Sequence, residues 1–199
     1  MPKEKWNEQF QQNKHTYGTK VNEFIQDKSA LFPDNANIAC FAEGEGRNAV
    51  YLAKQGHEVT AYDISPVGLH HAKLLAEENE VTINTVEADL VDMSVERNKY
   101  DGAIMVFGHV HELNQAKFLN NMIQSVKNGG YFIFEVYSKY QINYDTGGPG
   151  IEEMLYNPVE VLDIIKPYKC VHFYYGEVNR EEGYRHTGIG HVIQVVIQK

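Results

Sequence analysis

The sequence lacks several features that define other classes of protein. Only two cysteines, Cys40 and Cys170, occur among its 199 residues, and both lie on apolar segments, which favours reduced core residues over a disulfide. No apolar run is long enough to span a membrane, and the first residues contain no secretory signal, so the cytoplasm is the expected compartment. Basic residues number 18 against 27 acidic ones, and the net charge of −9 argues against nucleic acid as a partner.

Segments typical of strands and helices alternate along most of the chain. Such alternation implies parallel strands with helices on both faces of the sheet. Two long strand-like segments, 169–179 and 185–198, flank a hairpin-like turn at 180–183. The fold class is therefore α/β: a Rossmann-like, seven-stranded, mostly parallel sheet that ends in an antiparallel hairpin. The other expected strands are 38–42, 58–62, 82–88, 100–107 and 131–137, and the expected core helices are 47–54, 66–79, 114–127 and 158–165.

Two glycines, Gly44 and Gly46, lie between the first expected strand and the first core helix. Glycine permits a turn with positive φ and a close approach of the backbone to a ligand. The N–H groups of such a turn and of the helix N-terminus point towards a bound nucleotide. The second strand delivers Asp63, a carboxylate that can accept both hydroxyls of a ribose. The sequence thus predicts a nucleotide-cofactor site, whereas the glycines alone fit an ordinary turn.

The next two expected strands also end in residues that suit a nucleoside cofactor. Asp89 would accept from an adenine amino group, and Leu90 would pack on the base. Phe107-Gly108 and His109 follow the fourth strand. Because the carboxyl ends of parallel strands meet at one edge of a sheet, these residues are expected to lie together. Taken singly, each carboxylate fits a solvated loop residue or a helix cap as well.

On these motifs the chain resembles class I S-adenosylmethionine-dependent methyltransferases. Residues 42–48 occupy the position of the family's cofactor loop, 62–65 the ribose position and 87–90 the adenine position. The antiparallel hairpin at the end of a parallel sheet is also typical of the family. The Gly-Arg-Asn form of the loop, with Trp6 and Tyr17-Gly18 upstream, resembles small bacterial tellurite-resistance (TehB-like) methyltransferases. The resemblance implies S-adenosylmethionine as cofactor and methyl transfer to a small-molecule acceptor.

The resemblance also implies a set of cofactor-binding residues at the strand ends. The family usually has an acid where Ala42 stands and a third glycine where Asn48 stands. The methionine amine of the cofactor would then meet Glu43, Glu45 or backbone carbonyls beside the loop. The predicted cofactor-binding residues are Glu43, Gly44, Glu45, Gly46, Asn48, Asp63, Ile64, Ala88, Asp89, Leu90, Phe107 and Gly108.

His109 and His111 are the candidate catalytic residues. Both follow the fourth strand, and histidine is the usual base near neutral pH. His186 and His191 on the last strand are further candidates, although strand histidines more often form structural hydrogen bonds or lie at the surface. A soft nucleophile such as a thiolate or a chalcogen anion would need no base. No third ligand accompanies the His-x-His pair, so no metal is expected.

The chain is expected to form a single domain over residues 1–199. It would comprise an N-terminal helical lid over 1–30, a cofactor-binding β/α core over 36–137, and a substrate-side loop with the hairpin over 138–199. Two short amphipathic helices, broken at Tyr17-Gly18, make up the N-terminal part.

Large aromatic residues and a glycine-rich loop border the expected site. Trp6, Phe10 and Tyr17 either cover the cofactor or simply attach the N-terminal helices to the core. The loop 145–150 either lines the substrate pocket or only connects elements. Tyr137 and Tyr144 beside it are weak candidates for contact with substrate.

Two other functions stay open at this point. Residues 44–49 satisfy the dinucleotide fingerprint G-x-G-x-x-A, which would suit an NAD(P)-dependent reductase. The short chain, the lack of a Tyr-x-x-x-Lys pair and the antiparallel end favour the methyltransferase. The same fold could also bind S-adenosylmethionine without transferring a methyl group. The acceptor is predicted to be a small molecule, such as a thiol or a chalcogen oxyanion, and the chain to be a monomer or a weak homodimer.

Overall fold

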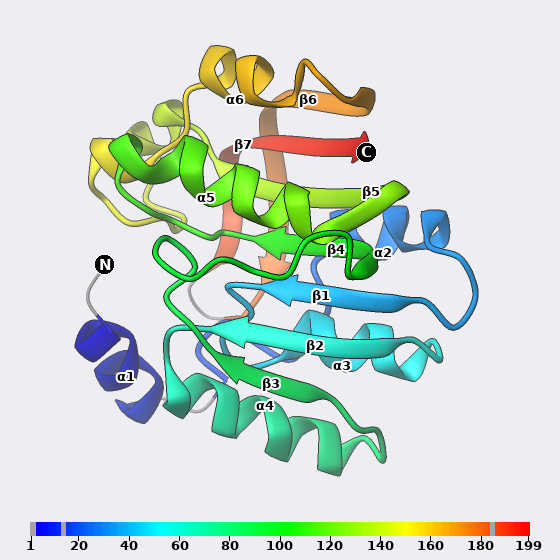
Figure 1. Cartoon of the computed structure of the whole chain (residues 1–199). Coiled ribbons are helices and arrows are strands. Elements are labelled where there is room, and N and C mark those ends of the chain that lie inside the picture. The colour runs from blue at the N-terminus through cyan, green and yellow to red at the C-terminus, as the bar shows by residue number, and fades with distance from the viewer. Residues whose placement is uncertain (1–2, 13–14, 184–185) are drawn as a thin grey trace.

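The computed structural model describes residues 3–12, 15–183 and 186–199. Seven strands form one sheet in the order β3-β2-β1-β4-β5-β7-β6 (Figure 1). The strands are β1 (Asn37–Phe41), β2 (Glu58–Asp63), β3 (Asn84–Glu87), β4 (Tyr100–Val106), β5 (Val126–Tyr137), β6 (Lys169–Glu182) and β7 (His186–Gln198). The α-helices are α1 (Lys3–Gln12), α2 (Glu23–Lys28), α3 (Arg47–Lys54), α4 (Pro66–Glu78), α5 (Glu112–Ser125) and α6 (Pro158–Ile165), and the 3₁₀ helices are η1 (Ser29–Leu31), η2 (Lys139–Asn143) and η3 (Glu152–Met154).

The predicted α/β fold class is confirmed. Strands β1 to β5 run parallel, β7 joins β5 antiparallel, and β6 pairs with β7 at the outer edge. The parallel strand β1 is buried from Ile38 to Phe41, as expected where helices cover both faces. The bounds predicted for α3 and α6 match the structure. Each helix has a sequence signal at its start, the glycine turn before α3 and Asn157-Pro158 for α6.

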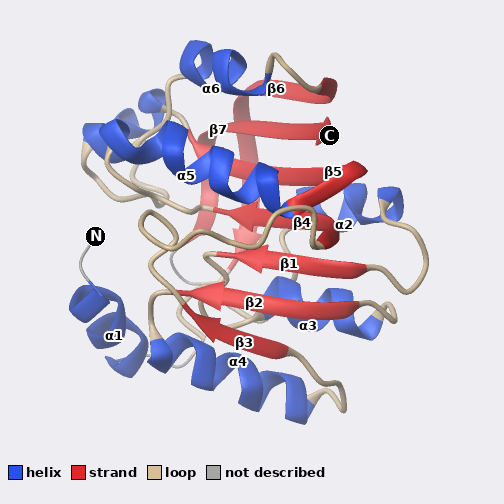
Figure 2. Cartoon of the chain, viewed as in Figure 1, coloured by secondary structure: helices blue, strands red, loops and turns tan. Residues whose placement is uncertain are grey.

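Helices cover the sheet in two separate layers (Figure 2). On one face, α5 and α6 pack their apolar side chains, including Phe118, Leu119 and Val161, against the sheet. On the other face, α2, α3 and α4 form a second core that includes Ile25 and Leu52. None of the helices in the described part of the chain is long and apolar enough to cross a lipid bilayer.

The carboxyl ends of the parallel strands meet at one edge of the sheet, at the left of Figure 2. Several of the connecting loops gather at this edge. Helix α1 lies at the same side, next to α4. In an open parallel sheet this edge is where ligands bind.

Apart from shifts of one or two residues at the ends of several elements, the structure differs from the sequence prediction in three places. The fifth strand was expected over 131–137, but β5 begins at Val126 and contains Asn128-Gly129-Gly130 as an irregularity in its pairing with β4. Residues 180–182, expected in the hairpin turn, continue β6, because Arg180 and Glu182 are buried in ion pairs. Cys40 is buried as predicted, but Cys170 is exposed on the edge strand rather than in the core.

Candidate functional site

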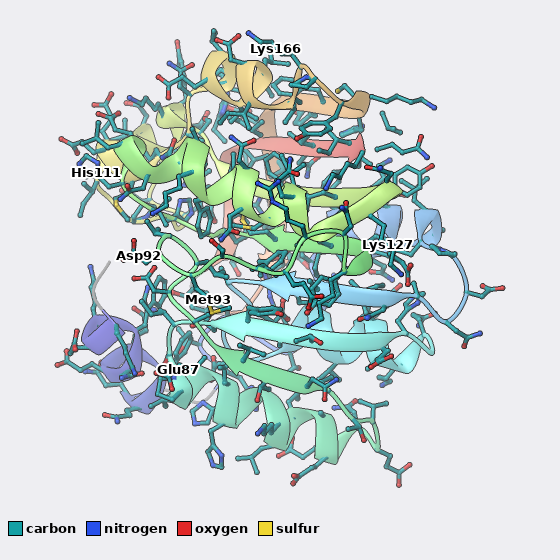
Figure 3. The ribbon with its side chains drawn as sticks, in the orientation of Figure 1. Glu87, Asp92, Met93, His111, Lys127 and Lys166 are labelled. Carbon is teal, nitrogen blue, oxygen red and sulfur yellow. The ribbon has the colours of Figure 1, made fainter. Side chains whose placement is uncertain are left out.

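A cavity of about 580 Å³ lies at the carboxyl ends of the parallel strands. Figure 3 places Asp92 and His111, two of the residues that line it, at this side of the sheet, whereas Lys127 lies at the opposite side. All of the predicted cofactor-binding and catalytic residues line the cavity except Gly46. Those that line it are Glu43, Gly44, Glu45, Asn48, Asp63, Ile64, Ala88, Asp89, Leu90, Phe107, Gly108, His109 and His111.

Gly46 has a packing role instead. Its φ is +87°, and a Cβ atom built on it would lie 2.6 Å from the Cβ of Ala72 in α4. Any side chain at this position would push α3 and α4 apart. Gly46 therefore lets the first turn of α3 approach α4 closely and fixes the position of the loop that lines the cavity.

Two non-glycine residues with left-handed backbone border the cavity. Ala42 has φ of +51° directly after β1, and Phe107 has φ of +55° directly after the neighbouring strand β4. Such conformations cost about 1–2 kcal/mol for residues with a side chain, and they cluster at functional sites. Position 42 is thus a turn position at which glycine would be favoured.

Glu43 caps helix α3. The N-cap residue Gly46 has no side chain to do so, and Glu43 Oε1 accepts the N–H groups of Asn48 and Ala49, each at 2.8 Å. Burial raises the pKa of the Glu43 carboxyl to about 7, although these hydrogen bonds and the nearby Arg47 act in the opposite direction. A carboxyl held at this pKa is ready to give up its proton when a cationic group approaches.

Asp63 holds the glycine turn against the end of β2. Its Oδ2 accepts the N–H of Gly44 and its Oδ1 accepts the N–H of Ser65, both at 2.8 Å. Burial raises the pKa of Asp63 to about 6, with the same backbone hydrogen bonds opposing the shift. Each carboxylate oxygen has lone pairs for a further bond, so Asp63 can hold the turn and still accept from ligand hydroxyls.

Glu45 ties the N-terminal segment to the core. Its carboxylate accepts the backbone N–H groups of His15 and Thr16 at 2.7 and 2.8 Å and lies 2.8 Å from Nδ1 of His71 in α4. These bonds fix the entry of residues 15–18 beside the cavity. Glu45 was a candidate for the cofactor amine, and the structure shows it engaged with the N-terminal segment.

Helix α1 covers part of the cavity with aromatic side chains. Trp6, Phe10 and Tyr17 all line the cavity, and the rings of Trp6 and Phe10 stack with centroids 5.8 Å apart. Phe10 packs closely on Gly44 and Gly68, where a Cβ atom would lie 3.1 and 2.9 Å from its ring. The contacts of Phe10 attach α1 to the core, whereas a cover over the cofactor stays a prediction.

The side of the cavity next to β3 has an apolar floor and an acidic rim. Ala88 and Leu90 are buried, whereas Asp89 is exposed and its Oδ1 accepts the N–H of Val91 at 3.0 Å. An apolar floor beside an exposed hydrogen-bond acceptor suits a purine ring with an amino group.

The opposite side of the cavity, next to β4 and β5, consists of stacked rings. Phe107, His109 and Tyr137 are nearly parallel, with centroids 4.4 Å apart for Phe107–Tyr137 and 5.6 Å for His109–Tyr137. His109 Nδ1 lies 3.1 Å from the carbonyl oxygen of Met154, so it carries the proton, and Nε2 is closed off from solvent. Burial lowers the pKa of His109 to about 4, which leaves the ring neutral at pH 7.

The other histidine and tyrosine candidates have structural contacts. His111 is exposed at the N-cap of α5, where its Nδ1 accepts the N–H of Leu113. His191 bonds to Ser138 Oγ at 2.7 Å, and the Tyr144 hydroxyl donates to Glu177. The side chain of His186 lies outside the described residues.

A buried ion-pair network behind the site was not predicted. Arg47 in α3 pairs with Glu182 at 2.7 Å, and Arg180 pairs with Glu135 while its guanidinium lies 4.6 Å from the Phe107 ring. The Asn22 side chain donates to both Glu135 and Glu182. These residues are far apart in sequence, and only the Arg47 position within the loop motif signalled a function. The network joins the hairpin, the N-terminal segment and the first turn of α3.

Comparisons with known proteins agree with this geometry. Residues 38–130 match a family model described as a methyltransferase domain. Curated relatives include a ubiquinone biosynthesis O-methyltransferase of Rickettsia canadensis, 31% identical over 129 residues, which covers 64% of this chain and 52% of the relative. The chain thus spans about half the length of this relative.

Solved structures share the fold of the whole chain. TehB of Haemophilus influenzae superposes with a TM-score of 0.74 at 17% identity, covering 98% of this chain and 67% of TehB. A TehB-like S-adenosylmethionine-dependent methyltransferase of Corynebacterium glutamicum gives 0.61 at 15% identity, covering 99% and 97%. The predicted resemblance is confirmed, and S-adenosylmethionine is the cofactor that the domain and the fold indicate.

The cavity has a size that suits this cofactor. Clefts of roughly 300–1,000 Å³ hold ligands of its size, and the cavity of about 580 Å³ falls within that range. The roles predicted for individual residues stay predictions.

Proposed function

We propose that this protein transfers the methyl group of S-adenosylmethionine to a small-molecule acceptor. The observation that carries the proposal is the Asp63 carboxylate, which holds the N–H of Gly44 and borders the cavity of the methyltransferase domain. The cofactor supplies a methyl group on a positively charged sulfur, which a nucleophile can attack directly. The chain's own residues then bind both reactants and hold them in line.

Each part of the cavity has a role in this proposal. Asp63 accepts the ribose hydroxyls, Asp89 and Leu90 hold the adenine, and the turn at Gly44 with Glu43 faces the methionine part. The rings of Phe107 and His109 border the acceptor. The sequence suggested a thiol or a chalcogen oxyanion as acceptor, and the curated relatives are named for O-methylation in ubiquinone biosynthesis. We place the protein in the cytoplasm as a monomer or weak homodimer, with neither membrane nor nucleic acid as partner.

Calorimetric titration with S-adenosylhomocysteine tests the cofactor, with NADH and NADPH titrated in parallel. We expect micromolar affinity for S-adenosylhomocysteine alone. Binding of a nicotinamide cofactor instead would favour the reductase that the glycine fingerprint also fits. Cofactor binding without transfer to any thiol, hydroxyl or chalcogen acceptor would indicate a binding protein rather than an enzyme.

A further inference from the structure

The charged and uncharged residues of the cavity lie at different ends. The carboxylates Glu43, Asp63 and Asp89 follow β1, β2 and β3, which are successive neighbours in the sheet. Beyond β1 the cavity continues past β4 and β5, where its wall is formed by Phe107, His109 and Tyr137. We call the part of the cavity next to β4 and β5 the acceptor end. We call the part next to β1, β2 and β3 the cofactor end, because it contains the predicted contacts with the nucleoside.

None of the three ring residues of the acceptor end carries a charge near neutral pH. Burial lowers the pKa of His109 to about 4 and raises that of Tyr137 to about 12, so both rings are neutral. The nearest guanidinium, that of Arg180, lies behind the Phe107 and Tyr137 rings and is paired with Glu135.

The cations that do line the cavity belong to its other parts. Arg47 in α3 is paired with Glu182, and Lys5 comes from α1, which packs against α4 beyond β2. Among the described residues, an anion at the acceptor end would therefore meet no cationic side chain, and the sulfonium of the cofactor would be balanced by the reacting thiolate alone. A second negative charge on the acceptor would lose its water without gaining a cationic partner, and such a transfer is strongly unfavourable.

The rings of the acceptor end provide no accessible base for a nucleophile that the protein would have to deprotonate. His109 Nδ1 faces the Met154 carbonyl and its Nε2 is shielded from solvent, while His111 is exposed at the start of α5. An alcohol, with a pKa far above 7, would need a base here. A thiol, with a pKa of about 8.5, ionises without one.

We propose that the acceptor end takes a small thiol that is uncharged apart from its reacting sulfur, and that it excludes acceptors that carry a further negative charge. This inference rests on the proposed methyl transfer. The thiol loses its proton to water, and its sulfur forms a bond to the methyl carbon. The sulfonium sulfur of the cofactor keeps the electron pair of the bond that breaks. A methyl thioether, S-adenosylhomocysteine and one proton result.

Two thiols of equal size test the inference: 2-mercaptoethanol, which is neutral, and mercaptoacetate, which carries a carboxylate. We expect kcat/KM for S-adenosylhomocysteine formation to be at least tenfold higher with 2-mercaptoethanol. Binding is followed separately through Trp6, the single tryptophan of the chain, which lines the cavity. In the presence of S-adenosylhomocysteine, its fluorescence should change with 2-mercaptoethanol and not with mercaptoacetate.

A charge introduced at the acceptor end should reverse the preference. Asn114 lines the cavity from the first turn of α5 and is partly exposed, so Asn114→Lys adds a cation there without filling the core. We expect the ratio of the two kcat/KM values to move at least fivefold towards mercaptoacetate. Asn114→Met, of similar length without charge, should leave the ratio unchanged.

The possible outcomes separate the two proposals. If S-adenosylhomocysteine itself does not change the Trp6 fluorescence or bind by calorimetry, the proposed function fails and the inference fails with it. If it binds but mercaptoacetate equals or exceeds 2-mercaptoethanol, the inference is overturned while the cofactor assignment stands. Absence of binding and turnover with either thiol in the presence of bound cofactor also overturns it.

Discussion

The two ends of the cavity are built in different ways. At the cofactor end, carboxylates hold backbone N–H groups: Glu43 caps α3, and Asp63 holds the turn at Gly44. At the acceptor end, the rings of Phe107, His109 and Tyr137 stack on one another. The first end depends on residues close together in sequence, whereas the second depends on contacts between β4, β5 and the loops after them. Local hydrogen bonding shapes the end that we propose for the cofactor, and long-range packing shapes the end that we propose for the acceptor.

The largest effect should follow from a side chain at Gly46. In Gly46→Ala the positive φ costs about 1–2 kcal/mol, and the clash with Ala72 adds about 1–3 kcal/mol of overpacking. We expect the free energy of unfolding to fall by about 3 kcal/mol, measured by urea denaturation. Gly129→Ala is the matched control, since Gly129 has φ of +85° with no atom within 4 Å of an added Cβ. Equal losses in the two variants would show that the contact with α4 contributes nothing.

The contrast between the ends also explains what the sequence could and could not predict. A short stretch of chain encodes the glycine turn, α3 and Asp63. In the structure the turn, the bounds of α3 and Asp63 at the end of β2 lie where the sequence predicted them. The packing function of Gly46 was not predictable, because Ala72 lies in the next helix. The extension of β6 through Glu182 was missed for a related reason. The composition of residues 180–182 is typical of a turn. Nevertheless Glu182 pairs with Arg47 and Arg180 pairs with Glu135, and both partners are distant in sequence.

Removing the charge of Asp63 should weaken the cofactor end alone. Asp63→Asn keeps the shape of the side chain but loses charge-assisted hydrogen bonds worth roughly 1.5–3 kcal/mol. We expect the affinity for S-adenosylhomocysteine to drop at least tenfold by calorimetry. Asp89→Asn, at an exposed position, should have a smaller effect. If Asp63→Asn binds as tightly as the wild type, Asp63 has no part in the ribose site.

The smallest expected effect is a pH dependence of ligand affinity at the cofactor end that is absent at the acceptor end. The pKa values of Asp63 and Glu43 are raised to about 6 and about 7, so both carboxyls hold protons more strongly in the folded protein than in water. A ligand that bonds to their ionised forms must displace those protons at low pH. Affinity for S-adenosylhomocysteine should therefore rise as the pH increases through these values and level off above pH 7. Ionisation of Asp63 by itself should raise the affinity about fourfold between pH 5.5 and pH 7.5, and a bond to ionised Glu43 would enlarge this gain.

The acceptor end should show no such change over the same range. His109 is already neutral well above its pKa of about 4, and Tyr137 stays protonated below about 12. The fluorescence titration of the S-adenosylhomocysteine complex with 2-mercaptoethanol should give one affinity from pH 5.5 to pH 7.5. His109→Phe keeps a ring in the stack and should preserve this flat profile, whereas His109→Ala should weaken acceptor binding without altering cofactor affinity. A change in acceptor affinity between pH 6 and pH 7, present in the wild type and lost in His109→Phe, would instead show that His109 ionises near neutrality. In that case the uncharged rings would no longer account for the choice of acceptor.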